Sequence, residues 1–186
     1  RLFIIIGIFL ITISSCKKEE VAVEVRFYDA KTDNNFYHVH FLNQKLGYVF
    51  GGKRWVKGVM AKTTDGGYSW STVDSITADV LYSAHFFNEQ EAIVCGFSGN
   101  ILYTNDSLKT FSTQHLPSWL PIRDVHFFDR NNGIAALGDG YTKGRFAYSK
   151  DGGQYWTQSD ENIHAFMCSQ MLAENLFVIA GYGTII

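Results

Sequence analysis

Short apolar segments alternate with polar turns along most of the chain, and they recur with a nearly constant period. Three copies share the order apolar–His–Phe–apolar–Asn/Asp, at Val39–Asn43, Ala84–Asn88 and Val125–Asp129. The central phenylalanines of these copies are 45 and 41 residues apart, and a weaker copy at Ser169–Leu172 lies 44 residues further on. Repeats of about 40–50 residues built from short strands are typical of propeller blades.

Each copy is followed by a polar turn and a second apolar run that ends in glycine. No segment has apolar residues at positions i, i+3, i+4 and i+7 over three turns, so helices are not indicated. Runs that are apolar throughout suit strands packed on both faces. In the first repeat the expected strands are Phe36–Leu42, Gly47–Gly51, Gly58–Thr63 and Ser69–Val73. We predict an all-β propeller of four-stranded antiparallel blades, at Phe36–Asp74, Tyr82–Gln114, Ile122–Ser159 and from Ala165 onward.

A second motif, Ser/Thr-x-Asp-x-Gly-x-x-Trp, has the same period. The aspartate is expected to accept hydrogen bonds from backbone amides of its own turn, and the glycine to supply a positive φ. The tryptophan is expected to fill the layer between strands and to find a partner for its indole N–H. In the second copy Leu108 replaces the glycine, which predicts a relaxed turn. The motif residues are Thr63, Asp65, Gly67, Trp70, Thr104, Asp106, Phe111, Ser149, Asp151, Gly153 and Trp156.

These aspartates could alternatively be catalytic or bind calcium. One carboxylate per turn, repeated in every blade, cannot build a single active site, and the dense oxygen pattern of a calcium loop is missing. We therefore interpret the motif as scaffold.

This motif resembles the Asp-box, or bacterial neuraminidase repeat, of sialidases, sortilin-type receptors, xyloglucanases and a large group of photosystem II assembly factor-like proteins. The order of motifs in Val39–Trp70, Ala84–Phe111 and Val125–Trp156 is most similar to the last group. The resemblance covers residues 36–186. It implies the propeller fold, and it says little about function because the motif residues are scaffold.

The N-terminus has the layout of a secretory signal. Leu2–Ile13 is an apolar run after Arg1, and as a helix it would span only about 18 Å of a ~30 Å hydrocarbon core. Ile13–Cys16 resembles the bacterial lipobox, which implies cleavage before Cys16 and acylation of its thiol. The alternative is a plain signal peptide with an incidental cysteine. We predict a lipoprotein signal at 1–16, a linker at 17–35 and the propeller at 36–186, anchored in the bacterial cell envelope with the outer membrane as the expected site.

Composition narrows the classes of partner. The net charge is −2 with 16 Lys and Arg, so there is no basic excess to bind nucleic acid. No Cys-x-x-Cys or His-x-x-x-His spacing occurs, and neither a metal nor a cofactor is indicated. Cys95 and Cys168 lie in apolar stretches and are expected to be buried free thiols, although export would permit a disulfide.

Three histidines, His40, His85 and His126, occupy the same position in successive repeats. They could form a ring of imidazoles around a central channel that holds a metal. The fourth repeat has Gln170 at this position, and the strand is packed on both sides. A hydrogen-bonded packing role therefore suffices.

Extended loops are the candidate ligand face. A propeller scaffold needs only a short loop between the second and third strands, such as Phe97–Asn100. Two longer, basic and aromatic loops and one proline-flanked link between blades exceed this minimum. Variable solvated loops are the alternative. The candidate residues are Arg54, Trp55, Trp119, Arg123, Tyr141 and Arg145.

Two functions remain in contention. The first is a non-catalytic binding or assembly scaffold with an unknown protein or glycan partner. The second is a sialidase-like or other glycoside hydrolase, which would need converging arginines and paired acids. The sialidase Arg-Ile-Pro motif is absent, and Pro121–Arg123 has the reverse order. The scaffold is favoured.

The chain is expected to be an incomplete propeller, with three blades and the start of a fourth. Its last segment, Gly181–Ile186, matches Gly96–Leu102 with one residue deleted and stops before the Asp motif. Closed propellers use about four to eight blades. Further blades could carry catalytic groups.

Overall fold

A computed structural model describes residues 25, 27, 32–140, 143–161 and 164–186 of this 186-residue chain. These residues form fifteen strands and one short 3₁₀ turn, arranged as four antiparallel sheets. No helix within this described part is long and apolar enough to cross a membrane. The predicted signal segment, Cys16 and most of the 17–35 linker lie outside the described residues.

Three sheets have four strands each, and consecutive strands pair in chain order. The first contains β1 (Asn35–Phe41), β2 (Gly47–Lys53), β3 (Lys57–Thr63) and β4 (Ser71–Thr77). The second contains β5 (Leu81–Phe86), β6 (Ala92–Gly96), β7 (Asn100–Thr104) and β8 (Ser112–His115), with the turn η1 (Phe97–Gly99) between β6 and β7. The third contains β9 (Ile122–Phe127), β10 (Gly133–Asp139), β11 (Lys143–Ser149) and β12 (Thr157–Gln158). A three-stranded fourth sheet contains β13 (Phe166–Ala173), β14 (Leu176–Gly181) and β15 (Thr184–Ile185).

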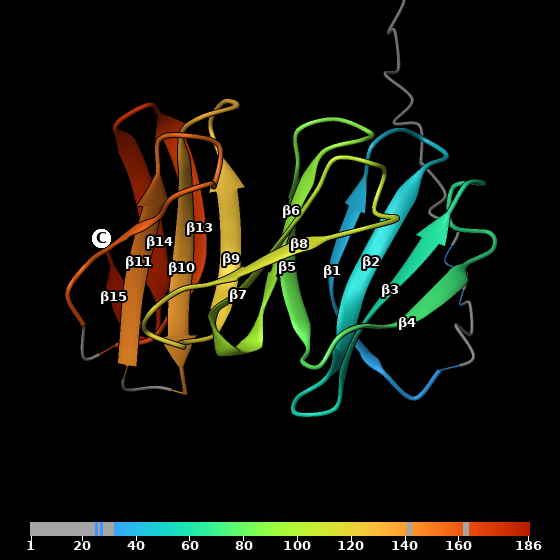
Figure 1. The fold of residues 1–186 in the computed structure, drawn as a ribbon, viewed down its shortest axis with the longest axis horizontal. Coiled ribbons are helices and arrows are strands. Elements are labelled where there is room, and N and C mark those ends of the chain that lie inside the picture. Colours follow the sequence, from blue (N-terminus) through green and yellow to red (C-terminus); the bar gives the residue numbers. More distant parts are fainter. Residues whose placement is uncertain (1–24, 26, 28–31, 141–142, 162–163) are drawn as a thin grey trace, which may run out of the picture.

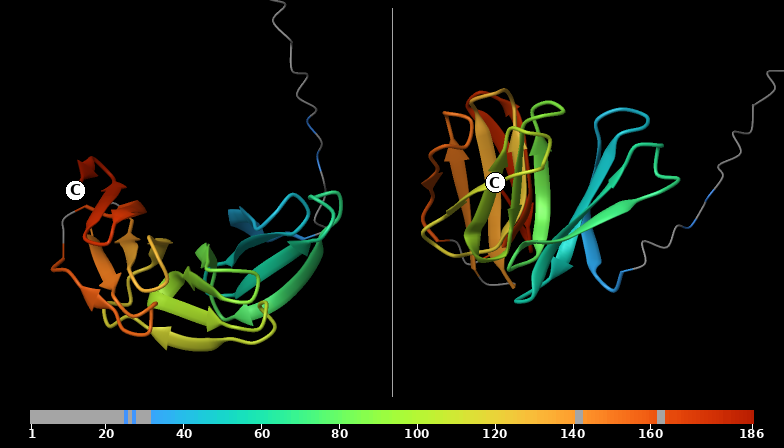
Figure 2. Two further views of the ribbon diagram at one scale, coloured as in Figure 1. Left: turned by 90° about the horizontal axis from the view of Figure 1, so that it is seen from above. Right: turned by 45° about the vertical axis from the view of Figure 1, so that its right-hand side comes forward.

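The sheets stand side by side in an arc, as Figure 1 and the left view of Figure 2 show. The first strands, β1, β5, β9 and β13, are neighbours along the inner side of this arc. The predicted all-β propeller is confirmed: three four-stranded blades and the first strands of a fourth. The predicted blade limits agree with the sheets to within three residues.

Packing between blades explains the runs that are apolar throughout. Successive side chains of a strand point to opposite faces of its sheet. In β6, Ala92 and Val94 join the core shared with the first blade, whereas Ile93 and Cys95 join the core shared with the third. All five residues of β6 are buried. Both faces of this blade are therefore interior surfaces.

The three Asp turns, at 63–70, 104–111 and 149–156, connect the third strand of a blade to its outer strand. In the first, Asp65 Oδ1 accepts a hydrogen bond from the Ser69 N–H at 2.9 Å, and Thr63 Oγ1 accepts one from the Gly67 N–H at 2.9 Å. Hydrogen bonds to the Asp65 carboxylate lower its pKa to about 2, and the largest contribution comes from the Ser69 hydroxyl. The Trp70 indole donates to the Gly67 carbonyl at 3.2 Å.

The second Asp turn is not relaxed, contrary to the expectation from Leu108. Leu108 adopts a φ of 64°, in the same left-handed region as Gly67 at 93°. Asp106 Oδ1 accepts from the Thr110 N–H at 3.0 Å, as in the first turn. The Leu108 side chain is only 5 % exposed in the core between the first and second blades. Its burial offsets the cost of the left-handed backbone, about 1–2 kcal/mol for a residue with a Cβ.

Two burial predictions at the ends of the arc are wrong. Trp156 is 7 % exposed in the core between the second and third blades, but the equivalent Trp70 is only half-buried. Cys168 is exposed, whereas Cys95 is buried as predicted, and both are free thiols. Within the described residues, one face of the first blade and one face of the fourth have no neighbouring blade, so side chains there remain accessible.

Candidate functional site

The predicted ligand residues lie on one side of the arc, which we call the linker face. It comprises the turns after the second strands (54–56 and 97–99), the links between blades (78–80 and 116–121) and the strand ends beside them. This face is at the bottom of Figure 1, and the Asp turns are at the top. Arg54, Trp55, Trp119, Arg123 and Arg145 all belong to it. Tyr141 lies outside the described residues.

Two exposed tryptophans flank the turn η1. Trp55 is 72 % exposed, and its ring meets the Phe97 ring edge-on with centroids 4.6 Å apart. The Arg54 guanidinium lies over the same Phe97 ring, 4.6 Å from its centroid. On the other side of η1, Trp119 is 63 % exposed, and a Cβ on Gly99 would lie 3.4 Å from the Trp119 Cα. We call Arg54, Trp55, Phe97 and Trp119 the aromatic shelf.

A buried carboxylate fastens the shelf across two blades. Asp79, in the link between the first and second blades, is 9 % exposed. One of its oxygens accepts the Trp55 N–H at 2.7 Å, and the other accepts the Ser98 hydroxyl at 3.1 Å. Trp55 and Ser98 both have left-handed backbones, with φ of 62° and 59°. The hydrogen bonds to Asp79 hold conformations that residues with a Cβ rarely adopt.

A second row of side chains occupies equivalent β-bulges in the inner strands. The pairing of each inner strand with its neighbour shifts at an equivalent residue, which is Tyr37, Tyr82, Arg123 or Met167, and β13 has a second shift at Leu172. A bulge redirects the side chain at that point. The Arg123 guanidinium stacks over the Tyr82 ring at 4.6 Å, and the Tyr82 and Tyr37 rings meet edge-on at 5.2 Å. Of this row, only Arg123 was predicted from the sequence, although the spacing of 45, 41 and 44 residues matches the histidine repeat.

The arginines of this face are held separately. Arg123 Nε donates to the Gly138 carbonyl at 2.9 Å. Arg145 donates to the Ser159 carbonyl at 2.6 Å and lies 3.9 Å from the Glu161 carboxylate. Across the described residues, no hydrogen bond or ring contact joins Arg54, Arg123 and Arg145 to one another. Each of these three arginines therefore has a different contact: the Phe97 ring for Arg54, the Gly138 carbonyl for Arg123 and the Ser159 carbonyl for Arg145.

The repeated histidines pack between blades and hydrogen-bond to the backbone. His85 Nδ1 accepts from the Phe127 N–H at 3.4 Å, and His126 Nδ1 accepts from the Met171 N–H at 3.1 Å. His40 instead stacks on Phe86 at 4.8 Å. Burial lowers the pKa of His85 to about 4 and also lowers that of His126. In the described part of the chain, no three His, Cys, Asp or Glu side chains are grouped to hold a metal. The packing interpretation is confirmed for His85 and His126.

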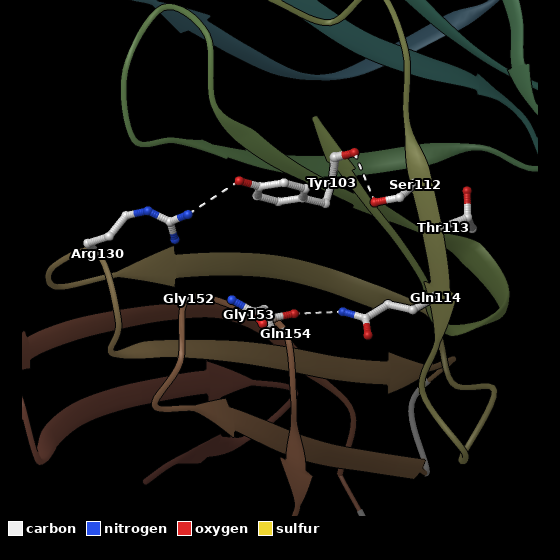
Figure 3. Close-up of a pocket in the computed structure, with 8 residues that line it drawn as sticks. All are labelled: Tyr103, Ser112, Thr113, Gln114, Arg130, Gly152, Gly153 and Gln154. Carbon is white, nitrogen blue, oxygen red and sulfur yellow. Dashed lines mark hydrogen bonds between the residues drawn. The ribbon is translucent and has the colours of Figure 1, made fainter. Parts of the chain in front are cut away.

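A cavity of about 290 Å³ opens elsewhere, between the outer part of the second blade and the third Asp turn (Figure 3). The Arg130 guanidinium lies 3.3 Å from the Tyr103 hydroxyl and 3.2 Å from the Glu91 carboxylate. A hydrogen bond from Tyr103 lowers the pKa of Glu91, so the carboxylate stays ionised beside Arg130. The Gln114 amide donates to the Gly153 carbonyl at 2.7 Å. These contacts tie the two blades together, and no predicted ligand residue lines this cavity.

The sequence matches the profile of one known protein family. The profile described as photosynthesis system II assembly factor YCF48 matches residues 17–163. The chain belongs to this family. Among solved structures, "YCF48 bound to D1 peptide" is similar over 73 % of this chain and 43 % of its own, with a TM-score of 0.59 and 21 % identity. YCF48 from Cyanidioschyzon merolae is similar over 81 % of this chain and 49 % of its own, with a TM-score of 0.60 and 16 % identity.

These likenesses establish the propeller fold. The chain spans less than half the length of either solved YCF48 structure. A search of curated proteins found no match.

Proposed function

We propose that this chain is a non-catalytic binding or assembly scaffold whose linker face takes up a segment of a partner protein. The observation that carries the proposal is the exposure of Trp55 and Trp119 on rigid loops of that face. Tryptophan and arginine dominate the binding energy of protein interfaces. One of the solved structures is of YCF48 bound to a D1 peptide. Membership of the same family supports a protein ligand here.

We also propose that the propeller is exported and attached to the bacterial cell envelope, at the outer membrane, by lipid on Cys16. The apolar run Leu2–Ile13 and the lipobox-like Ile13–Cys16 support this. The predicted linker at 17–35 would then hold the propeller close to the membrane surface.

The hydrolase alternative gains no support from the described residues. Glycosidases need two carboxyl groups that flank the scissile bond. Asp65 and Asp106 instead accept hydrogen bonds from their own turns, which lower the pKa of each to about 2. The three described arginines of the linker face each contact a different group of the protein itself.

Selection of displayed peptides tests the binding function. The whole chain would be used to select from a library of random dodecapeptides, and hydrogen exchange would map the selected peptides on the protein. We expect a shared sequence pattern among the selected peptides and slower exchange in 54–56, 97–99 and 116–121. Tyr155, 72 % exposed on the third Asp turn, reports on the opposite face, where exchange should not change. Failure to select any peptide, together with hydrolysis of a sialoside or xyloglucan by the chain, would contradict the proposal.

A further inference from the structure

The aromatic shelf has the properties of a built recognition site. Trp55 and Trp119 are 72 % and 63 % exposed, although large aromatic side chains gain most from leaving water. Both have left-handed backbones, with φ of 62° and 57°, which is an uncommon conformation for a bulky residue. Such backbones persist where the surrounding structure over-determines them, and they cluster at binding sites.

Hydrogen bonds and ring contacts within the protein hold the residues of the shelf in place. Asp79 fixes the Trp55 N–H and the Ser98 hydroxyl, and the Leu116 carbonyl accepts the Trp119 N–H at 3.1 Å. The Trp119 ring also rests against His115, with centroids 5.1 Å apart. Each tryptophan is thus supported by a protein ring and is largely open to solvent. Pre-organised aromatic side chains lose little conformational entropy on binding.

The charge of Arg54 indicates the chemistry of the partner. In the part of the chain that the structure describes, Arg54 forms no ion pair, and its guanidinium stacks on Phe97. The nearby Asp79 carboxylate already accepts hydrogen bonds on both oxygens. A guanidinium stacked on a ring retains its edge donors, which match a carboxylate in bidentate geometry.

We propose that the aromatic shelf binds a peptide in which an apolar side chain and a carboxylate are only a few residues apart. The apolar group lies against Trp55 and the carboxylate pairs with Arg54, because both side chains contact the same Phe97 ring. Trp119, on the other side of η1, contacts the neighbouring part of the peptide. This inference rests on the proposed function and specifies the partner chemistry. The partner is acidic because the Arg54 guanidinium is the charged group beside Trp55 that remains available, whereas the Asp79 carboxylate is buried and already hydrogen-bonded.

Fluorescence anisotropy with defined peptides tests this site. The probes are labelled decapeptides with one Phe, Trp or Leu placed one to four residues before or after a Glu, and matched sets carry Gln in place of Glu. The whole chain should bind at least one Glu peptide and bind its Gln match about ten-fold more weakly. Trp55→Ala and Trp119→Ala should each weaken binding about ten-fold. Tyr155→Ala, which removes an equally exposed aromatic ring on the opposite face, should have no effect.

A separate measurement tests the contact between Arg54 and the peptide carboxylate. Arg54→Gln should remove the discrimination between Glu and Gln peptides, whereas Arg54→Lys should retain part of it. Melting curves should be unchanged for these exposed positions, which separates binding from folding.

Three outcomes would overturn the inference: equal affinity for Glu and Gln peptides, no loss of affinity in either tryptophan variant, or Trp55-dependent binding of an oligosaccharide panel in place of peptides. Failure of the proposed function is distinguishable. If library-selected peptides still protect the linker face while the shelf variants bind them normally, the scaffold proposal stands and the shelf proposal fails.

Discussion

The Nδ1 atom of His126 accepts a hydrogen bond from the backbone N–H of Met171, 3.1 Å away in the next blade. Asp124, two residues earlier in β9, accepts a hydrogen bond at 2.7 Å from the N–H of Ser169, which lies in the same blade as Met171. The inner strand of each sheet is an edge strand with unpaired backbone groups. Side chains of the third blade thus accept hydrogen bonds from backbone N–H groups at the edge of the fourth blade. The same relation links His85 to Phe127.

We predict that acid weakens the propeller through these histidines. An unfolded histidine titrates near pH 6.5, whereas burial lowers the pKa of folded His85 to about 4. The unfolded state therefore binds more protons between these values, so stability present above about pH 6.5 is lost as the pH falls toward 4. Urea midpoints measured from about pH 7.5 to pH 4.5 should show this loss. His85→Gln should reduce the slope and exposed His115→Gln should not; an identical slope in both variants would refute the account.

The two tryptophans of the Asp turns should differ in their contribution to stability. Trp156→Ala empties a site between two blades and should cost about 3–5 kcal/mol. Trp70 is only half-buried in the described structure, and Trp70→Ala should cost about 1 kcal/mol. Denaturant unfolding of the two variants gives the comparison. Equal losses would show that Trp70 is covered by further structure.

Leu108 permits a test of how the second Asp turn is stabilised. Leu108→Ala removes buried contacts but keeps a Cβ at a φ of 64°, and should cost about 2–5 kcal/mol. Leu108→Gly removes more volume but relieves the left-handed backbone, so it should be about 1 kcal/mol more stable than the alanine variant. Urea unfolding midpoints of the alanine and glycine variants test this order of stability. An alanine variant more stable than the glycine variant would show that the backbone at residue 108 is not strained.

Membrane attachment depends on Cys16 in this account. Cys16→Ser removes the thiol that would be acylated and should move the protein from the membrane fraction to the soluble fraction of cells. Cys168→Ser, which changes an exposed free thiol of the propeller, serves as the control and should remain with membranes. Retention of the Cys16→Ser protein in the membrane pellet would contradict the lipid anchor.

Local patterns in the sequence predict most of the fold. The repeated His-Phe segments and Asp motifs predict the blade limits because both are set by strand and turn chemistry. Burial of Trp70 and Cys168 could not be predicted, because it depends on whether another blade covers that face. The relaxed turn predicted from Leu108 was wrong because packing against another blade, far away in the sequence, stabilises its strained backbone.

The candidate site was predicted only in outline. Arg54, Trp55 and Trp119 stand out because their loops exceed what a blade needs. Asp79 and Phe97, which hold these residues in place, look like ordinary linker residues until the hydrogen bonds and ring contacts are known. The bulges at Tyr82 and Arg123 are register shifts, which apolar patterning does not reveal, although their period was visible.

Site-specific photocrosslinking in intact cells tests the central claim most directly. A photoreactive aromatic amino acid, which keeps a ring at the site, would replace Trp119 on the linker face or, in a matched variant, Tyr155 on the opposite face; both side chains are exposed, at 63 % and 72 %. We predict a discrete protein adduct from position 119, lost when Trp55→Ala is added, and none from position 155. Adducts of equal yield from both positions, or none from position 119, would contradict a binding role for the linker face.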